Sequence, residues 1–164
     1  MSFKTIEWLD KGALRLIDQR QLPIETVYAD FTDYKGVATA IREMVVRGAP
    51  AIGATAGYGM ALTAFHSDAE SVEELRAELE TAAEVLRTSR PTAVNLFWAI
   101  DRMLRLINDN GLASVEKLKA ATINEAHAIA DEDVQTNKNM GLNALPLIPD
   151  EALIIHHCTH LCSF

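Results

Sequence analysis

PAIGATAGYGMALTAF, residues 50–65, decides how this chain folds, because it is an apolar run that three glycines interrupt. Proline fits the first turn of a helix, so the run predicts a helix from Pro50 to about His66. Each glycine inside a helix costs about 1 kcal/mol relative to alanine. The usual compensation is the close approach of another backbone or of a ligand. We therefore expect neighbours to pack tightly against this helix.

The sequence before this run predicts a small β-sheet. Three short apolar stretches, at residues 5–8, 13–17 and 24–28, predict strands. The turn pairs Lys11-Gly12 and Leu22-Pro23 separate them. We therefore expect a small antiparallel three-stranded meander at the start of the chain.

Four further helices are expected beside the first, which makes the fold class α+β, a small meander followed by a five-helix bundle. Apolar residues recur at three- and four-residue spacing, and capping residues mark the starts. The additional helices are expected from Thr32 or Asp33 to near Arg47-Gly48, from Ser71 to Thr88, from Ala93 to Asp109 and from Ser114 to about Met140. We expect Phe97 and Trp98 in the core, Arg102 facing water, and the acidic run 131–133 on a solvated helix face.

The last part of the chain predicts the start of a second domain. Residues 141–150 contain two prolines and are expected to form a loop, and residues 152–156 an apolar strand. A single strand after five helices has no obvious partner, and too few residues follow it to complete an α/β unit. We therefore divide the chain into a meander plus helical domain, residues 1–145, and a linker with a truncated start of a C-terminal α/β domain, residues 146–164.

The composition is that of a globular protein and excludes several classes of function. Of 164 residues, 49% are apolar and 23% are charged, and the formal net charge is -8. Such an acidic chain has no overall basic field for nucleic acid or an anionic membrane surface. It lacks the apolar run of a signal peptide or a membrane span, so we expect a cytoplasmic protein without nucleic-acid or membrane partners. Both cysteines, Cys158 and Cys162, fall near the end, which excludes a disulfide framework.

The segment VVRGAPAIG, residues 45–53, has the features of an anion site. Arg47 lies in a tight turn directly before a helix, and the amides of Gly48, Ala49 and the first helical turn lack intrahelical partners. The helix dipole adds partial positive charge there, so the segment suits a phosphate. A purely structural interpretation also fits, in which Arg47 ends the preceding helix and Gly48 is its left-handed C-cap. Taken alone, the pattern slightly favours the structural interpretation.

The segment TSRPTAVNLFWA, residues 88–99, repeats this arrangement. Arg90 lies in a short loop before a helix, with Thr92 available as N-cap. Two such loops could converge on one phosphate and offset its charge locally, although the whole protein is acidic. The structural alternative is an exposed loop arginine, which this pattern alone favours.

The C-terminal segment HHCTHLCSF, residues 156–164, contains histidines and cysteines but predicts no metal site. Their spacing matches no common zinc site, and a chain end is poorly held. Cys158 would instead follow a strand, at the position where α/β folds present reactive groups. A helix N-terminus after it could polarise the thiol, but no such helix follows.

Three blocks together resemble the N-terminal signature blocks of methylthioribose-1-phosphate isomerases. They are DQRQLP at 18–23, AIREMVVRGAPAIGATAGYGMAL at 40–62 and SRPTAVNLFWAIDRM at 89–103, and EDVQTNKNMG at 132–141 is similar to a looser fourth block. The resemblance covers residues 4 to 158. The ribose-1,5-bisphosphate isomerases and the regulatory subunits of the translation-initiation exchange factor are related families. They leave two other functions open: a regulatory or binding module for a phosphate ligand, and a ribose-1,5-bisphosphate isomerase.

The resemblance implies an aldose-ketose isomerase of methionine salvage and methionine biosynthesis. Its substrate would be the sugar phosphate 5-methylthioribose 1-phosphate and its product 5-methylthioribulose 1-phosphate, with no metal and no organic cofactor. Substrate binding carries onto Arg47, Gly48, Ala49 and Arg90, and the catalytic cysteine onto Cys158.

The chain departs from this family after Cys158, inside a signature block. The family continues there with asparagine and a glycine-rich turn, and its catalytic aspartate lies in a C-terminal Rossmann-like domain, whereas this chain has six further residues and stops. Such a change is typical of a frameshift or a premature stop, and an engineered fragment would give the same sequence. We expect the isolated chain to lack substantial isomerase activity. We also expect exposed apolar surface to favour a homo-oligomer.

Overall fold

A computed structural model of the chain describes residues 4–109 and 111–153. The N-terminal sheet has three antiparallel strands in the order β1 (Ile6–Leu9), β2 (Ala13–Ile17) and β3 (Tyr28–Phe31). Leu14 and Leu16 of the central strand are fully buried. The predicted meander is therefore confirmed, with β2 as the strand that reaches the core.

The third strand begins later than predicted. We expected it at 24–28, but the backbone amides of Ile24 and Glu25 both donate to the carbonyl oxygen of Gln21 in a turn. These amides are therefore not available to a strand ladder, and Ile24 is 94% exposed. Pairing starts only at Tyr28, which lies opposite Ile17.

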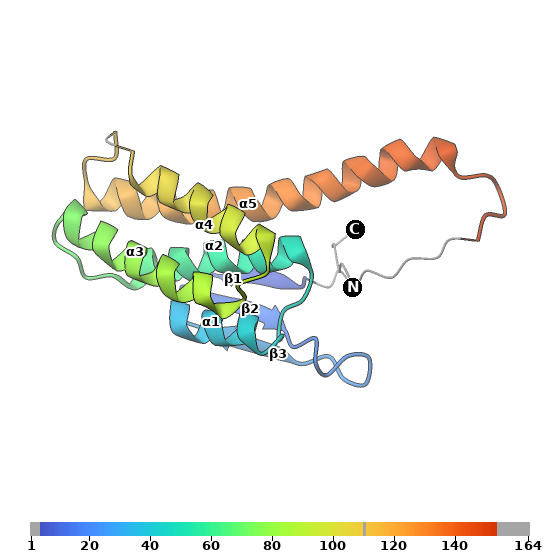
Figure 1. Cartoon of the computed structure of the whole chain (residues 1–164), viewed down its shortest axis with the longest axis horizontal. Helices are drawn as coiled ribbons and strands as arrows, with labels where there is room; N and C mark the ends of the chain where they lie inside the picture. The colour runs from blue at the N-terminus through green and yellow to red at the C-terminus, as the bar shows by residue number, and fades with distance from the viewer. Residues whose placement is uncertain (1–3, 110, 154–164) are drawn as a thin grey trace.

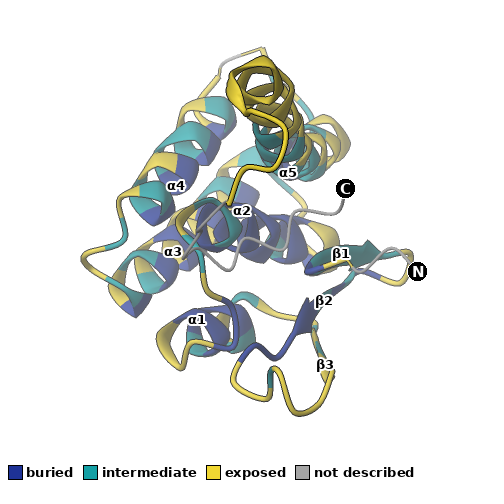
Figure 2. Ribbon diagram, turned by 90° about the vertical axis from the view of Figure 1, so that its right-hand side faces the viewer, coloured by how far each residue is buried: buried dark blue, intermediate teal, exposed yellow. Residues whose placement is uncertain are grey.

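The five predicted helices are all present. They are α1 (Tyr34–Arg42), α2 (Ala49–His66), α3 (Val72–Ser89), α4 (Val94–Ile107) and α5 (Val115–Ala144), and a 3-10 turn follows at Leu145–Leu147. Figure 2 shows α2 in the middle, with the other helices and the sheet around it. None of the helices in the described part of the chain could span a membrane.

The predicted C-terminal end of α1 was wrong. Helix α1 ends at Arg42 rather than near Arg47-Gly48, because Met44 has a positive φ of 58° and the chain turns there to bury Val45 and Val46. Gly48 is therefore not the C-cap of α1. It is the N-cap of α2, so the structural interpretation of Gly48 was wrong.

Helix α5 continues through residues 141–144, which we expected to be a loop. A single exposed glycine at 141 costs about 1 kcal/mol and does not break a helix whose backbone bonds continue. Ala152 and Leu153 are not in a strand. The remainder of the predicted terminal strand lies outside the described residues.

The glycines of α2 allow close packing with its neighbours, as the sequence predicts. A Cβ atom at Gly53 would lie only 2.9 Å from the backbone oxygen of Asn95 in α4. Gly57 faces α5, and Gly59 faces side chains of α1 and α3. Because no real Cβ atom approaches a backbone oxygen this closely, Gly53 fixes the separation between α2 and α4.

The segment after β2 holds the loop that precedes α2. The carboxylate of Asp18 accepts hydrogen bonds from Nε and Nη2 of Arg20 at 2.8 and 2.7 Å. The Gln19 backbone amide donates to Val45 O at 2.9 Å, and its side chain donates to Arg47 O at 3.4 Å. The Arg20 guanidinium holds the pKa of the Asp18 carboxyl below its ordinary value, although burial opposes this shift. The block DQRQLP therefore supports the Arg47 loop.

We predict that Gly53→Ala destabilises the protein, although alanine is the better helix former. Overpacking against Asn95 should cost about 1–3 kcal/mol, more than the gain of about 1 kcal/mol in helix propensity. Gly141→Ala is the matched control, since no atom lies within 4 Å of its added Cβ, and it should stabilise. Urea denaturation of both variants tests this, and equal shifts in the same direction would contradict it.

We predict that Asp18→Asn destabilises the protein at neutral pH by about 1.5–3 kcal/mol, because it removes charge-assisted hydrogen bonds. The folded-state pKa of Asp18 is lowered, so its contribution is complete above the unfolded-state value of about 3.9. The contribution is lost as the pH falls through the lowered pKa, and the two proteins should converge in strong acid.

Asp30→Asn is the control for this effect, because the ion pair of Asp30 with Arg15 is exposed and should contribute under about 1 kcal/mol. Thermal unfolding of the three proteins from pH 2 to pH 7 measures the differences. A difference between wild type and Asp18→Asn that does not change with pH would show that the charge of Asp18 is unimportant.

Candidate functional site

The first turns of α2 and α4 lie side by side, and the second half of α5 extends beyond them (Figure 1). The N-cap residues of these two helices, Gly48 and Ala93, make no side-chain hydrogen bond to the first turn. The predicted cap Thr92 is therefore wrong. By contrast, α1, α3 and α5 are capped by the side chains of Asp33, Ser71 and Ser114. The two helices without such caps thus leave first-turn amides for other acceptors.

Arg47 and Arg90 flank these two uncapped helix starts. Within the described part of the chain, neither guanidinium has a hydrogen-bonding or salt-bridging partner in the structure. Arg47 is exposed and its charge helps to lower the pKa of Asp18, whereas Arg90 is half-buried. Gly48 has a backbone φ of 96°, which residues with a side chain rarely adopt, so the turn between Arg47 and α2 requires glycine.

The arrangement suits an anion. Two helix starts with partial positive charge lie side by side, and an arginine loop precedes each, so a phosphate there could accept hydrogen bonds from amides and arginines. The structure therefore places the sequence-predicted residues Arg47, Gly48 and Ala49, like Arg90, beside these two adjacent helix starts. Cys158 lies outside the described residues.

A pocket of about 470 Å³ adjoins these helix starts, and sequence analysis missed it. Its lining comes from α2, α4 and α5: Pro50, Gly53, Val94, Asn95, Trp98, Ile129, Glu132, Asp133 and Thr136. Trp98 is 47% exposed, so its predicted place in the core was wrong, whereas Phe97 packs partly buried against the core. The available signal was Gly53, which indicated a close neighbour without naming it.

Arg102 ties α4 to α5 beside this pocket. We expected its side chain to face water, but its guanidinium makes salt bridges to Glu125 and Glu132 of α5. The same guanidinium lies 5.5 Å from the ring centroid of Trp98. Hydrogen bonds from Arg102 hold the pKa of Glu132 below its ordinary value. The acidic run 131–133 is therefore only partly a solvated helix face.

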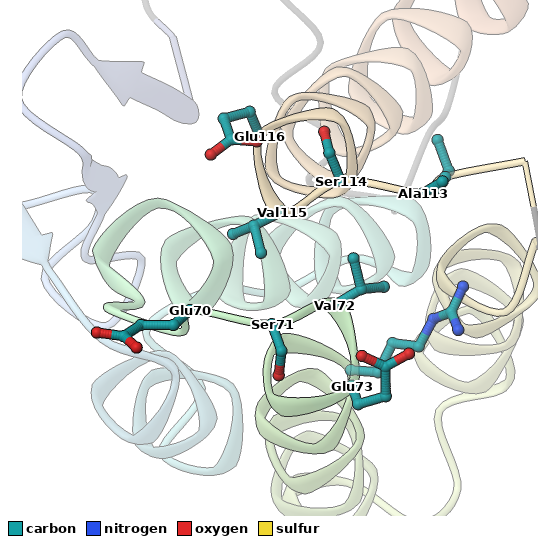
Figure 3. A pocket seen from close by; sticks show the side chains of 10 residues that line it. Glu70, Ser71, Val72, Glu73, Ala113, Ser114, Val115 and Glu116 are labelled. Atoms are coloured by element: carbon teal, nitrogen blue, oxygen red, sulfur yellow. The ribbon is translucent and has the colours of Figure 1, made fainter.

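A second pocket, of about 590 Å³, lies where α3 and α5 begin (Figure 3). It also contains two helix starts, but the side chains of Ser71 and Ser114 already cap them. Its lining includes three glutamates, Glu70, Glu73 and Glu116, and one arginine, Arg76, which donates to the backbone oxygens of Ile107 and Asp109. The excess of negative charge balances the helix dipoles and disfavours an anion.

A third pocket, of about 480 Å³, lies beside the aromatic residues Trp8, Tyr58 and His127. The Tyr58 hydroxyl is 3.0 Å from Nδ1 of His127. Burial, with the charge of Asp131, raises the pKa of Tyr58 to about 12, so its phenol stays protonated at neutral pH. Within the described residues, no group of three or more His, Cys, Asp or Glu side chains could hold a metal ion. The predicted absence of a zinc site concerns residues 156–164, which are not described.

Comparisons with known proteins agree with the resemblance in the sequence. A methylthioribose-1-phosphate isomerase of Synechococcus sp. is 48% identical over 95% of this chain and 44% of its own length. One of Geobacter sulfurreducens is 45% identical over 96% of this chain and 45% of its own length. This chain therefore spans less than half the length of the curated relatives it matches.

Two solved structures have the same fold as this chain. A 5-methylthioribose 1-phosphate isomerase of Pyrococcus horikoshii has a TM-score of 0.85 and 43% identity, and the match covers 89% of this chain and 41% of that one. The delta subunit of translation initiation factor eIF-2B from A. fulgidus has a TM-score of 0.82 and 40% identity, with 92% and 43% coverage. The model of the initiation factor 2 subunit family matches residues 45–161, well over half of the chain. The chain belongs to the initiation factor 2 subunit family.

Proposed function

We propose that this chain forms the N-terminal part of a methylthioribose-1-phosphate isomerase. The observation that carries the proposal is its 44–48% identity, over at least 95% of its length, to several relatives that have this name. A regulatory or phosphate-binding module is the second candidate, which the likeness to the eIF-2B delta subunit favours. The fold is common to both kinds of protein, so the chemistry of the site has to distinguish them.

In the proposed enzyme, the two uncapped helix starts bind the phosphate of the substrate. Arg47 and Arg90 would donate charge-assisted hydrogen bonds to its oxygens, and the amides of Gly48 and Ala49 would donate further ones. An aldose 1-phosphate is locked as a ring, so the enzyme must open the ring before hydrogen moves between C1 and C2. Cys158 would act there as an acid or base, or would stabilise the transition state.

The proposed division of the chain follows from this function. Residues 1–145 would form the domain that binds the phosphate, and residues 146–164 would form the linker and the start of a C-terminal α/β domain. The second half of α5 supports this division because its residues from 138 to 144 are exposed. The relatives are more than twice as long as the matched segment. In a protein of that length, the part after the matched segment would contribute the rest of the active site.

The test is a chimera in which this chain replaces the matching part of the Synechococcus relative. We expect it to convert 5-methylthioribose 1-phosphate to 5-methylthioribulose 1-phosphate, whereas the 164-residue chain alone does not. Arg47→Ala or Arg90→Ala should raise KM about 10- to 100-fold, as the loss of a charge-assisted hydrogen bond predicts. Cys158→Ala should lower kcat with little change in KM.

Arg105→Ala is the matched control for the two arginine variants, because Arg105 is also exposed but lies in the last turn of α4, away from both loops. It should leave kcat and KM unchanged. A folded chimera that binds the sugar phosphate without turnover would support the regulatory module instead. Full activity with unchanged KM in both arginine variants would rule out the proposed phosphate site.

We also infer that the protein is cytoplasmic, where methionine salvage would require it.

We further infer that the chain self-associates. Exposed apolar side chains at the end of α5 and beyond support self-association. Among the described residues these are Met140, Leu142, Leu145, Leu147, Ile148 and Leu153. We predict that sedimentation velocity detects oligomers at micromolar concentration. Replacing Leu142 and Leu145 by glutamate should give monomers, and an unchanged sedimentation coefficient would contradict this.

A further inference from the structure

The pocket between α2, α4 and α5 adjoins the proposed phosphate site. Pro50 lines this pocket and lies in the first turn of α2, directly after the Arg47 loop. Val94 and Asn95 line it from the first turn of α4, directly after the Arg90 loop. A ligand that is anchored by its phosphate at the two helix starts can therefore extend a second group into the pocket.

The chemistry of the pocket near these helix starts is apolar. Val94 is 78% exposed and Trp98 is 47% exposed, although both are large apolar residues that α4 could have buried. The ring of Trp98 is held from one side by the guanidinium of Arg102, which is itself fixed by two salt bridges to α5. An indole ring that is positioned in this way favours a small apolar or thioether group, because sulfur makes attractive contacts with aromatic rings.

The charges around the pocket determine which end of a sugar phosphate can enter it. Glu132 and Asp133 line the far side of the pocket on α5, and Glu132 is held ionised by Arg102. These carboxylates repel a phosphate but tolerate a neutral thioether. Arg47 and Arg90 attract the phosphate at the other end. The two charge patterns together favour one orientation of a ligand with a phosphate on one carbon and an apolar substituent at the opposite end.

We propose that this pocket, with Trp98 as its specificity-determining residue, binds the apolar substituent at C5 of the sugar phosphate, a methylthio group in the substrate of the proposed function. The inference rests on that proposed function. It assigns the discrimination between a methylthio sugar and other sugar 1-phosphates to α4 and α5. A thioether and its methyl group fit easily into a volume of about 470 Å³.

The experiment compares two substrates in the chimera with the Synechococcus relative. They are 5-methylthioribose 1-phosphate and 5-deoxyribose 1-phosphate, which keeps the ring and the phosphate but lacks the methylthio group. Trp98→Ala should reduce the ratio of kcat/KM for the first substrate over the second by about tenfold, because a pocket discriminates one small apolar group by about this factor. Thr136→Phe, which fills the pocket from α5, should reduce the same ratio without removing any core residue.

Tyr28→Ala is the control, since Tyr28 is 44% exposed and lies on β3, and it should leave the ratio unchanged. An active chimera whose ratio does not change in Trp98→Ala and Thr136→Phe overturns this inference and leaves the proposed function intact. A folded chimera that is inactive on both substrates, beside an active parent enzyme, overturns the proposed function and this inference with it.

Discussion

The contact between Gly53 and the backbone of Asn95 is the constraint on which the arrangement of this protein depends. Because residue 53 has no side chain, the first turn of α2 can approach α4 until the two helix backbones are in contact. Gly57 makes a similar approach possible for α5. The three helices therefore surround one pocket, and the loops that carry Arg47 and Arg90 arrive at the same end of it.

The helix starts in the described part of this chain are of two kinds, those with a side-chain cap and those without one. Side chains of Asp33, Ser71 and Ser114 satisfy the first turns of three helices, at a gain of about 1 kcal/mol each. Helices α2 and α4 forgo this gain, and both follow a loop with an arginine that has no partner among the described residues. A protein with a net charge of -8 can thus retain a local preference for an anion.

Sequence alone predicted most features that depend on local chemistry. The five helices and the N-terminal meander follow from periodicity and capping, and the glycines of residues 50–65 indicated close packing. Local signals still misplaced the start of β3 and the end of α1. The errors at the candidate site concern contacts between distant segments. Arg102 leaves water only because Glu125 and Glu132 of α5 lie opposite it, and helix periodicity does not contain that information. The pocket beside Trp98 was missed for the same reason, because three helices form it.

The residues of this pocket bear on the choice between an isomerase and a regulatory subunit. Both kinds of protein share the fold, so two helix starts with arginines are consistent with either function. A module that binds only phosphate has no need of an exposed indole, and leaving Trp98 half in water forfeits part of the burial free energy of its ring. An enzyme that selects one sugar phosphate by an apolar substituent recovers this free energy when the substrate covers the ring. The exposure of Trp98 in the described part of the chain therefore supports the proposed isomerase function.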